Sequence, residues 1–217
     1  MAILSEPGKI LITGATHGIG KAAAELFCSR GWEVYGISGN GEDGRGAAME
    51  KTLPGFHYRV ADVSNEPEIS ALLGRIGQLD AAFNNAGTGI APQKLPEADI
   101  ARARRVIDVN LVGTLICMKH EIAHMPGSGV VVNNASLAAF KAATGADMSY
   151  SASKAGVLAL TAEAAANPEF AGRVSFFSIA PGYIETRMTA ADDKEAQKRR
   201  LPSRRLGQPA EVAALVY

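Results

Sequence analysis

The sequence predicts an α/β fold, a doubly wound domain in which helices cover both faces of a mostly parallel sheet. Short apolar runs alternate with longer helical segments along the chain, and this alternation is typical of parallel sheets. A glycine-rich turn joins the first predicted strand to the first predicted helix. Small or polar residues follow the ends of several strands. Because ligands bind at the carboxyl ends of the strands in such sheets, these residues indicate a binding site.

The predicted elements follow this pattern in chain order. The run Lys9–Thr13 is a short buried strand, and the glycine turn after it leads into a helix over 18–30. The other strands are predicted at 33–37, 57–61, 80–84, 129–134 and 173–179. Most of these strands end at small or polar residues. Further helices are predicted at 66–76, 97–125, 149–166 and 209–217, with a glycine-rich loop over 39–46.

Composition limits the classes of protein to which the chain can belong. Its 217 residues suffice for one domain with a sizeable core, and acidic and basic residues are equal in number. We therefore expect neither nucleic acid nor an anionic membrane as a partner. No apolar run approaches the roughly 20 residues that span a bilayer, and the N-terminus lacks a signal-peptide pattern. Cys28 and Cys117 are far apart and are interpreted as ordinary thiols. We expect a cytoplasmic protein.

Tyr150 and Lys154 are the first candidate catalytic residues. They are four residues apart in a predicted helix, so their side chains share one face of it. An ammonium group favours the charged form of a neighbouring acid, so the pKa of the phenol is predicted to fall from about 10 toward neutrality. Such a phenol can exchange a proton with an alcohol or a carbonyl oxygen. Taken alone, the pair is also explained by two neighbouring surface residues.

The turn Gly14-Ala15-Thr16-His17-Gly18-Ile19-Gly20 lies between the first strand and the first helix. In this context Gly14 permits a tight turn, Gly18 permits close approach to a pyrophosphate, and Gly20 permits close packing of helix on strand. The free N–H groups and the dipole of the helix N-terminus favour phosphate there. The alternative is an ordinary strand-to-helix turn that contains glycines.

Further motifs follow in order: Asp62-Val63, Asn84-Asn85-Ala86-Gly87, Asn110, Ser136, Tyr150-x-x-x-Lys154 and Pro181-Gly182-Tyr183-Ile184-Glu185-Thr186. Together with the glycine turn, they span nearly the whole chain. In these residues and their spacing the chain resembles the short-chain dehydrogenase/reductase family. The resemblance implies a single Rossmann-type, NAD(P)-binding domain over residues 1–217. It also implies an oxidoreductase that transfers hydride between a nicotinamide and a small-molecule carbonyl or alcohol.

The resemblance implies four catalytic residues. Tyr150 would be the acid in reduction and the base in oxidation, while Lys154 would lower its pKa and hold the nicotinamide ribose. Ser136 would orient the substrate oxygen, and Asn110 would hold a helix bend and a water linked to Lys154. From the residues alone, Ser136 is also explained as a turn cap, and Asn110 as a buried amide bonded to the backbone.

The resemblance also implies which residues contact the cofactor. Asp62 would accept from the adenine amino group beside the backbone of Val63, although a helix cap also explains it. Pro181 and Gly182 would form the wall of the site beside the nicotinamide. From the residues alone, they are also explained as a simple turn after a strand. The full implied set is Gly14, Thr16, His17, Gly18, Ile19, Gly20, Ser38, Asp62, Val63, Asn85, Ala86, Gly87, Tyr150, Lys154, Pro181, Gly182, Ile184 and Thr186. No metal site is expected.

The end of the second strand bears on the choice between NADP and NAD. An acidic residue there binds the ribose 2′-hydroxyl and repels a 2′-phosphate, whereas this chain has Ser38. His17 and Arg45 are basic groups that could serve a phosphate. Glu42 and Asp43 in the same loop oppose it, so NADP is only slightly preferred.

Two alternative functions stay open. His120-Glu121-Ile122-Ala123-His124 fits the H-E-x-x-H pattern of a zinc hydrolase. No third ligand follows at a helical spacing, so we interpret Lys119, His120, Glu121 and His124 as a solvated face. The other alternative is a redox-sensing protein that binds the cofactor without turnover.

Residues 187–206 are expected to form a lid over the substrate. Arg187 and the other basic residues there would favour an acidic or phosphorylated substrate, or form a solvated helix face balanced by Asp192, Asp193 and Glu195. Met148, Tyr183, Met188, Ala138 and Phe140 are expected to line an apolar pocket. A final strand that the family has after residues 207–212 is expected to be absent. The small-residue-rich helix 151–166 suits a homodimer or homotetramer.

Overall fold

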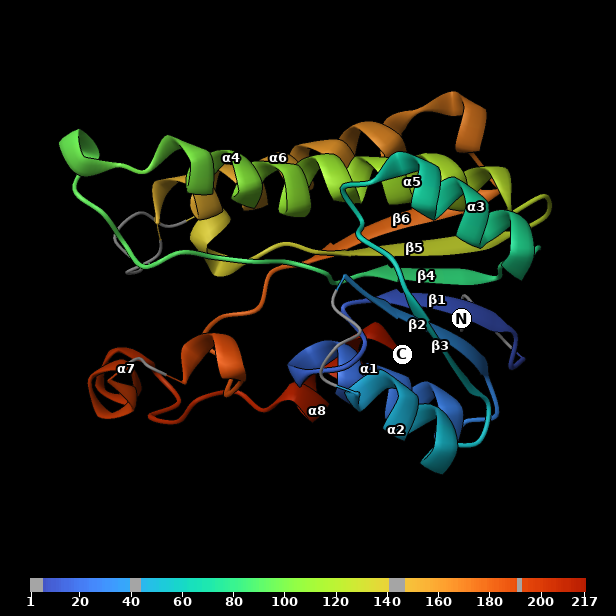
Figure 1. The fold of residues 1–217 in the computed structure, drawn as a ribbon, viewed down its shortest axis with the longest axis horizontal. Helices are drawn as coiled ribbons and strands as arrows, with labels where there is room; N and C mark the ends of the chain where they lie inside the picture. Colours follow the sequence, from blue (N-terminus) through green and yellow to red (C-terminus); the bar gives the residue numbers. More distant parts are fainter. Residues whose placement is uncertain (1–5, 40–43, 141–146, 191–192) are drawn as a thin grey trace.

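The computed structural model describes residues 6–39, 44–140, 147–190 and 193–217. Glu42, Asp43 and Asp192, which were considered above, lie outside the described residues. The described chain forms a six-stranded sheet with the order β3-β2-β1-β4-β5-β6 (Figure 1). All neighbouring strands are parallel, which confirms the predicted doubly wound α/β fold. The strands are β1 (Lys9–Thr13), β2 (Glu33–Ser38), β3 (Phe56–Val60), β4 (Ala81–Asn84), β5 (Gly129–Asn134) and β6 (Val174–Ile179).

Helices cover both faces of the sheet. In Figure 1, α3 to α6 lie over one face, and α1, α2 and α8 lie over the other. Their bounds are α1 (Gly18–Ser29), α2 (Arg45–Thr52), α3 (Glu66–Ile76), α4 (Ile100–Ile107), α5 (Gly113–Ala123), α6 (Met148–Ala166), α7 (Lys194–Arg200) and α8 (Pro209–Val216). Short 3₁₀ turns occur at Leu95–Glu97, Leu137–Ala139, Pro168–Phe170 and Arg187–Thr189. Within the described residues, no helix is both long and apolar enough to cross a membrane.

One predicted element differs from the structure, and α2 and α7 have no counterpart among the predicted helices. The helix predicted over 97–125 is interrupted, because a π-helical turn at Asp108–Val112 separates α4 from α5. Helix α2 begins within the loop predicted over 39–46 and has no counterpart in the prediction. The other predicted strands and helices agree with the structure to within one residue at each end.

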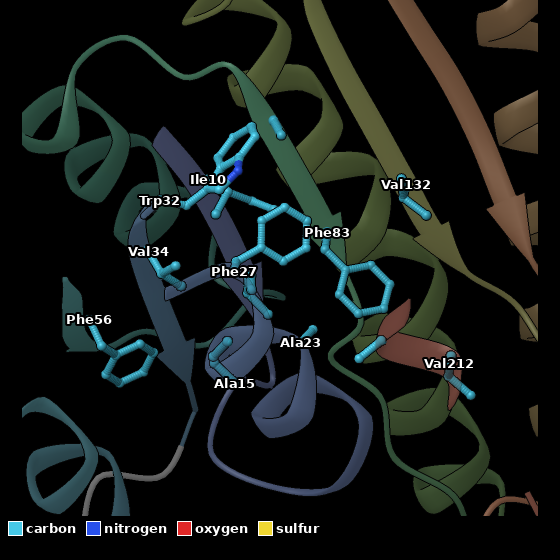
Figure 2. Close-up of a cluster of buried hydrophobic side chains, with 14 of the residues drawn as sticks. Ile10, Ala15, Ala23, Phe27, Trp32, Val34, Phe56, Phe83, Val132 and Val212 are labelled. Carbon is cyan, nitrogen blue, oxygen red and sulfur yellow. The ribbon is translucent and has the colours of Figure 1, made fainter. Parts of the chain in front are cut away.

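The core has two halves, one on each face of the sheet. Successive side chains of a strand point to opposite faces. Accordingly, Ile10 of β1 packs with Phe27, Val34 and Phe83 on the α1 side (Figure 2), whereas Leu11 packs in the cluster on the opposite face. Both halves hold the strands so that the ends of β1, β4, β5 and β6 meet at one edge. The order of the strands reverses between β1 and β4, which is where such sheets form a crevice.

Candidate active site

A cleft of about 450 Å³ lies at the carboxyl ends of these strands, within the size range of ligand-binding sites. It brings together fourteen of the residues predicted from the sequence: Gly14, His17, Gly18, Ile19, Asn85, Ala86, Gly87, Ser136, Tyr150, Lys154, Pro181, Gly182, Ile184 and Thr186. The remaining lining residues are Thr88, Gly89, Asn134, Ala135, Arg187, Met188 and Thr189. Chain segments that are far apart in sequence therefore meet at one site.

The glycine turn forms one wall of the cleft. Gly18 has a φ of +47°, and a Cβ there would lie 3.0 Å from Cγ2 of Thr186. A Cβ on Gly20 would lie 2.2 Å from the carbonyl oxygen of Gly14, so this position accepts no side chain. Helix α1 begins at Gly18 and no side chain caps it. Its first N–H groups therefore point into the cleft with no intrahelical partner, which fits a bound pyrophosphate.

Asn85 and Thr13 hold this turn against the end of β4. The Asn85 Nδ2 group donates to the carbonyl oxygens of Thr13 and Gly14, at 3.0 and 3.3 Å. The Thr13 hydroxyl accepts from the backbone N–H groups of Asn85 and Ala86, at 2.9 and 2.8 Å. These bonds fix the distance between the phosphate side of the cleft and the side formed by β4.

Tyr150 lies in the first turn of α6, which Asp147 caps by accepting from the Ser149 N–H at 2.8 Å. Its hydroxyl is hydrogen-bonded to the side chain of Ser136, which follows β5. Burial raises the pKa of Tyr150 above its usual value of 10, and the bond to Ser136 opposes this increase. The prediction that Lys154 brings this pKa toward neutrality was therefore wrong. The phenol is protonated at neutral pH, the form that protonates a carbonyl oxygen.

Lys154 lies one helical turn beyond Tyr150 and is 4% exposed. Its Nζ donates to the carbonyl oxygen of Asn134 at 2.6 Å and lies 5.8 Å from the centroid of the Tyr150 ring. Burial lowers the pKa of Lys154 to about 8. The ammonium group is thus directed at the strand end and the ring rather than at the hydroxyl, which explains why it does not lower the phenol's pKa.

Asn110 lies in the π-helical turn, behind the cleft. Its Nδ2 donates to the Thr88 carbonyl at 2.9 Å and to the Ser153 hydroxyl at 3.0 Å, and its Oδ1 accepts from the Thr88 N–H at 2.8 Å. A π-turn inside an α-helix often occurs at a functional site. Here it places a fully buried amide against the loop that carries Thr88.

Five of the predicted cofactor contacts lie outside the lining of the cleft. Thr16 Oγ1 is 2.8 Å from Nδ1 of His17, Gly20 packs under the turn, and Val63 packs against Gly113. Ser38 Oγ is 2.6 Å from the Tyr58 hydroxyl.

Asp62 accepts from the Ser64 N–H at 2.9 Å and pairs with Arg105 at 2.6 Å. Burial alone would raise the pKa of Asp62, but the bonds from Ser64 and Arg105 lower it. Helix α3 begins after Asn65, so Asp62 is not its cap. A Cβ on Gly39 would lie 3.7 Å from the Asp62 Cα. The ends of β2 and β3 thus form a second group of polar residues next to the cleft.

The H-E-x-x-H segment does not converge on one point. His120 Nε2 is 3.1 Å from Glu66, and His124 Nδ1 is 2.7 Å from the carbonyl oxygen of His120. Glu121 is 0% exposed, so the prediction that it belongs to a solvated face was wrong. In the described residues, no group of His, Cys, Asp or Glu is arranged to hold a metal ion.

Two residues contribute to the site without having been predicted from the sequence. Asn134 acts through its backbone carbonyl, and Thr88 acts through backbone groups. A backbone contact leaves no trace in residue type, so no signal in the sequence marked them. Among the residues expected to line an apolar pocket, Met188 does line the cleft, whereas Met148, Tyr183, Ala138 and Phe140 lie outside its lining.

Comparison with known proteins agrees with this site. The sequence model of the short chain dehydrogenase family matches residues 8–197. The chain is 36% identical over 216 residues to cis-4-hydroxycyclohexanecarboxylate dehydrogenase of Sinomonas cyclohexanicum, covering 95% of this chain and 86% of that protein. It is 36% identical over 215 residues to cyclohexanol dehydrogenase of Acinetobacter sp. (strain SE19), covering 95% and 84%.

The structure of ElxO with NADP bound superposes with a TM-score of 0.87 at 26% identity, covering 98% of this chain and 90% of that one. These findings do not favour a zinc hydrolase or a cofactor-binding protein without turnover. The chain belongs to the short-chain dehydrogenase/reductase family and is an NAD(P)-dependent oxidoreductase that acts on CH–OH groups.

Proposed function

We propose that this protein interconverts cyclic secondary alcohols and ketones, and that Ser136, Tyr150 and Lys154 carry out the proton chemistry. The observation that carries this proposal is that Ser136, Tyr150 and Lys154 line the same cleft as the glycine turn. The relatives that act on cyclohexanol and on a hydroxycyclohexane carboxylate support the choice of a cyclic substrate.

When bound, the nicotinamide supplies or accepts the hydride. In reduction, the Tyr150 hydroxyl donates its proton to the substrate oxygen, while Ser136 donates a hydrogen bond that orients this oxygen and stabilises its developing charge. Lys154, whose ammonium lies 5.8 Å from the centroid of the Tyr150 ring, would hold the nicotinamide ribose beside the reacting groups. In oxidation, the phenolate accepts the proton of the alcohol. Asn110 keeps the Thr88 loop in place and touches no reacting group, so we assign it a positioning role.

Arg187 points to a further feature of the substrate. It lines the cleft next to Met188, and within the described part of the chain no acidic side chain forms an ion pair with it. An unpaired guanidinium favours a carboxylate, which it can bind through two parallel hydrogen bonds. We therefore propose that a cyclic ketone or alcohol with a carboxylate is preferred over a neutral one.

This preference is expected to appear when 4-oxocyclohexanecarboxylate and cyclohexanone are compared by cofactor absorbance with NADPH and NADH. We expect a higher kcat/KM for the carboxylate, and we expect Arg187→Ala to reduce that advantage by about 10-fold, the effect of one charged hydrogen bond. Arg75→Ala, at an exposed position of α3, is the matched control. An unchanged ratio in Arg187→Ala would refute the role of Arg187, and no turnover of any cyclic substrate would refute the proposed function.

For the cofactor, we propose a preference for NADP. Ser38 ends β2 and carries no charge that would repel a 2′-phosphate. Arg45 begins α2, close to Ser38 in the chain, and its positive charge would favour a 2′-phosphate. The residues proposed to bind the adenine side are Ser38, Asp62 and Val63, with Thr16 and Gly20 supporting the turn.

Ser38→Asp is expected to reverse this preference. The carboxylate would repel the 2′-phosphate and accept from the 2′-hydroxyl, so the ratio of kcat/KM for NADPH to that for NADH should fall by on the order of 10-fold or more. Ser70→Asp, at an exposed position of α3, adds the same charge away from the cleft and should leave this kcat/KM ratio unchanged. A wild-type protein that already prefers NADH would contradict the proposal.

We propose that residues 187–206 act as a lid within one domain, since Arg187, Met188 and Thr189 line the cleft. Assembly into a homo-oligomer through α5 and α6 is consistent with the partly exposed side chains of Val112 and Leu115 on that side.

A further inference from the structure

Glu121 is an ionisable residue of helix α5, on the face of the sheet that this helix covers. It is 0% exposed and is not part of the cleft. Its nearest polar contact is Asn84 at the end of β4, whose Nδ2 donates to Glu121 Oε2 at 2.9 Å. An ionised carboxylate without a cation is rarely buried in this way, so its protonation state needs a structural explanation.

The hydrogen bonds around Glu121 have a fixed direction. The Thr161 hydroxyl donates to the Val157 carbonyl at 2.7 Å, and therefore accepts from Asn133 Nδ2 at 3.0 Å. The Oδ1 of Asn133 consequently faces Asn84 and accepts from its Nδ2 at 3.0 Å. Both hydrogens of the Asn84 amide are thus donated, one to Asn133 and the other to Glu121. The reversed orientation of the Asn84 amide would place its oxygen against Asn133 Oδ1, which is also an acceptor. Only the orientation with Nδ2 toward Asn133 and Glu121 therefore fits.

Two acceptors remain at the end of this chain of hydrogen bonds. Across the described residues, Oε1 of Glu121 and Oδ1 of Asn84 are buried and have no hydrogen-bond partner. They belong to the two side chains that already share one bond. If Glu121 is ionised, both atoms are acceptors and neither can satisfy the other. A proton on Oε1 would make it a donor, and Asn84 Oδ1 is an acceptor without a partner on the side chain to which Glu121 is already bonded.

We propose that Glu121 is a protonated carboxylic acid in the native protein, paired reciprocally with the Asn84 carboxamide, and that this pair is a positioning element for the cleft. Amide N–H donates to the carboxyl carbonyl, and carboxyl O–H donates to the amide carbonyl. Glutamine at position 121 would form the same pair of bonds without a titratable proton.

The positioning role follows from the neighbours of the two asparagines. Asn84 precedes Asn85, which holds the glycine turn, and Asn133 precedes Asn134, whose carbonyl accepts from Lys154. Asn134 Nδ2 also donates to Asn85 Oδ1 at 2.9 Å. The Glu121–Asn84 pair therefore holds the ends of β4 and β5 from the face of the sheet that α5 covers. This part of the inference rests on the proposed function, whereas the assignment of the proton does not.

The electrostatic surroundings agree with the geometry. Burial raises the pKa of Glu121 to about 8, and the bond from Asn84 only partly opposes this increase. The titratable group that interacts with Glu121 is the thiol of Cys117 on the same helix, whose pKa burial and Glu121 both raise. The neighbouring side chains from β4, β5 and α6 are those of Asn84, Asn133 and Thr161, which do not titrate. Because the native pKa lies above the usual 4.5, the native state holds the proton more tightly than the unfolded chain. The stabilisation is complete below 4.5 and is lost as the pH rises to about 8.

The proton is tested on the complete protein with Glu121→Gln and, as matched control, Glu163→Gln at an exposed position of α6. Near pH 7, the infrared spectrum of wild type should contain the carbonyl stretch of a protonated carboxylic acid that Glu121→Gln lacks and Glu163→Gln retains. The Tm of Glu121→Gln minus that of wild type should increase between about pH 5 and pH 8. Lys154 is present in both proteins and cancels in this difference. Identical infrared spectra, or a difference in Tm that does not depend on pH, would overturn the assignment.

The positioning role is tested by turnover and cofactor affinity in the same variants. Glu121→Gln should retain wild-type kcat and cofactor affinity, whereas Glu121→Ala should lower kcat/KM by about 10-fold to 100-fold through displaced strand ends. Full activity in Glu121→Ala, or equal losses in both variants, would overturn the positioning role. If Glu121→Ala does not fold, a loss of activity in Glu121→Gln still overturns it. Absence of turnover in wild type would refute the proposed function but leave the infrared result intact.

Discussion

Tyr150→Phe is expected to lower turnover by about 10²- to 10⁴-fold, the usual contribution of a general acid, while cofactor affinity stays close to that of wild type. The variant loses only the hydroxyl that is bonded to Ser136, and the ring still fills its place beside Lys154. Turnover is measured with NADPH and a cyclic ketone, and affinity by quenching of protein fluorescence or by calorimetry.

The matched control for this substitution is Tyr35→Phe, which removes a hydroxyl bonded to Glu33 on β2, away from the cleft. It should leave both turnover and cofactor affinity unchanged. Retained turnover in Tyr150→Phe would exclude Tyr150 as the proton donor. Loss of cofactor binding with turnover would instead assign it a structural role.

Lys154→Met is expected to lower turnover by about 10²- to 10³-fold, the range for a removed electrostatic stabiliser, without a matching loss of stability. The pKa of Lys154 lies at about 8 in the folded protein against the usual 10.5. The native state therefore holds this proton less tightly than the unfolded chain, which costs wild type stability below pH 8. As the pH rises from about 8 to 10.5, that cost disappears. The Tm of the variant relative to wild type should decrease across this window.

Lys119→Met serves as the control, because Lys119 is exposed and pairs with Glu66 at 2.6 Å. It should affect neither turnover nor the dependence of Tm on pH in this window. If Lys154→Met turned over substrate like wild type, the ammonium would have no part in the reaction. A difference in Tm that increased with pH would contradict the lowered pKa.

The sequence was sufficient to predict the fold and most of the cleft for a physical reason. Apolar residues repeat differently in strands and helices, and ligand-binding residues of a parallel sheet follow the ends of its strands. Gly14, Asn85, Ser136 and Pro181 each follow a predicted strand end, and all of them line the cleft. Tyr150 and Lys154 were placed on one face by helical spacing alone.

The features that were missed depend on three-dimensional surroundings. The π-turn at Asp108–Val112 inserts a bend that residue type does not record, because its residues are also compatible with an α-helix. The burial of Glu121 depends on Asn84 and Asn133, which come from distant parts of the chain. The pKa of Tyr150 was predicted from its neighbour on the helix, but burial raises this pKa and only the Ser136 side chain opposes the increase.

The most direct test of hydride transfer is to follow deuterium during reduction of a cyclic ketone by NADPH that carries deuterium at both C4 positions. Wild type is expected to place the deuterium on the carbinol carbon of the alcohol product, and Tyr150→Phe, with cofactor bound, to yield almost no labelled alcohol. Unlabelled alcohol from wild type, or equal labelling by the two proteins, would contradict it.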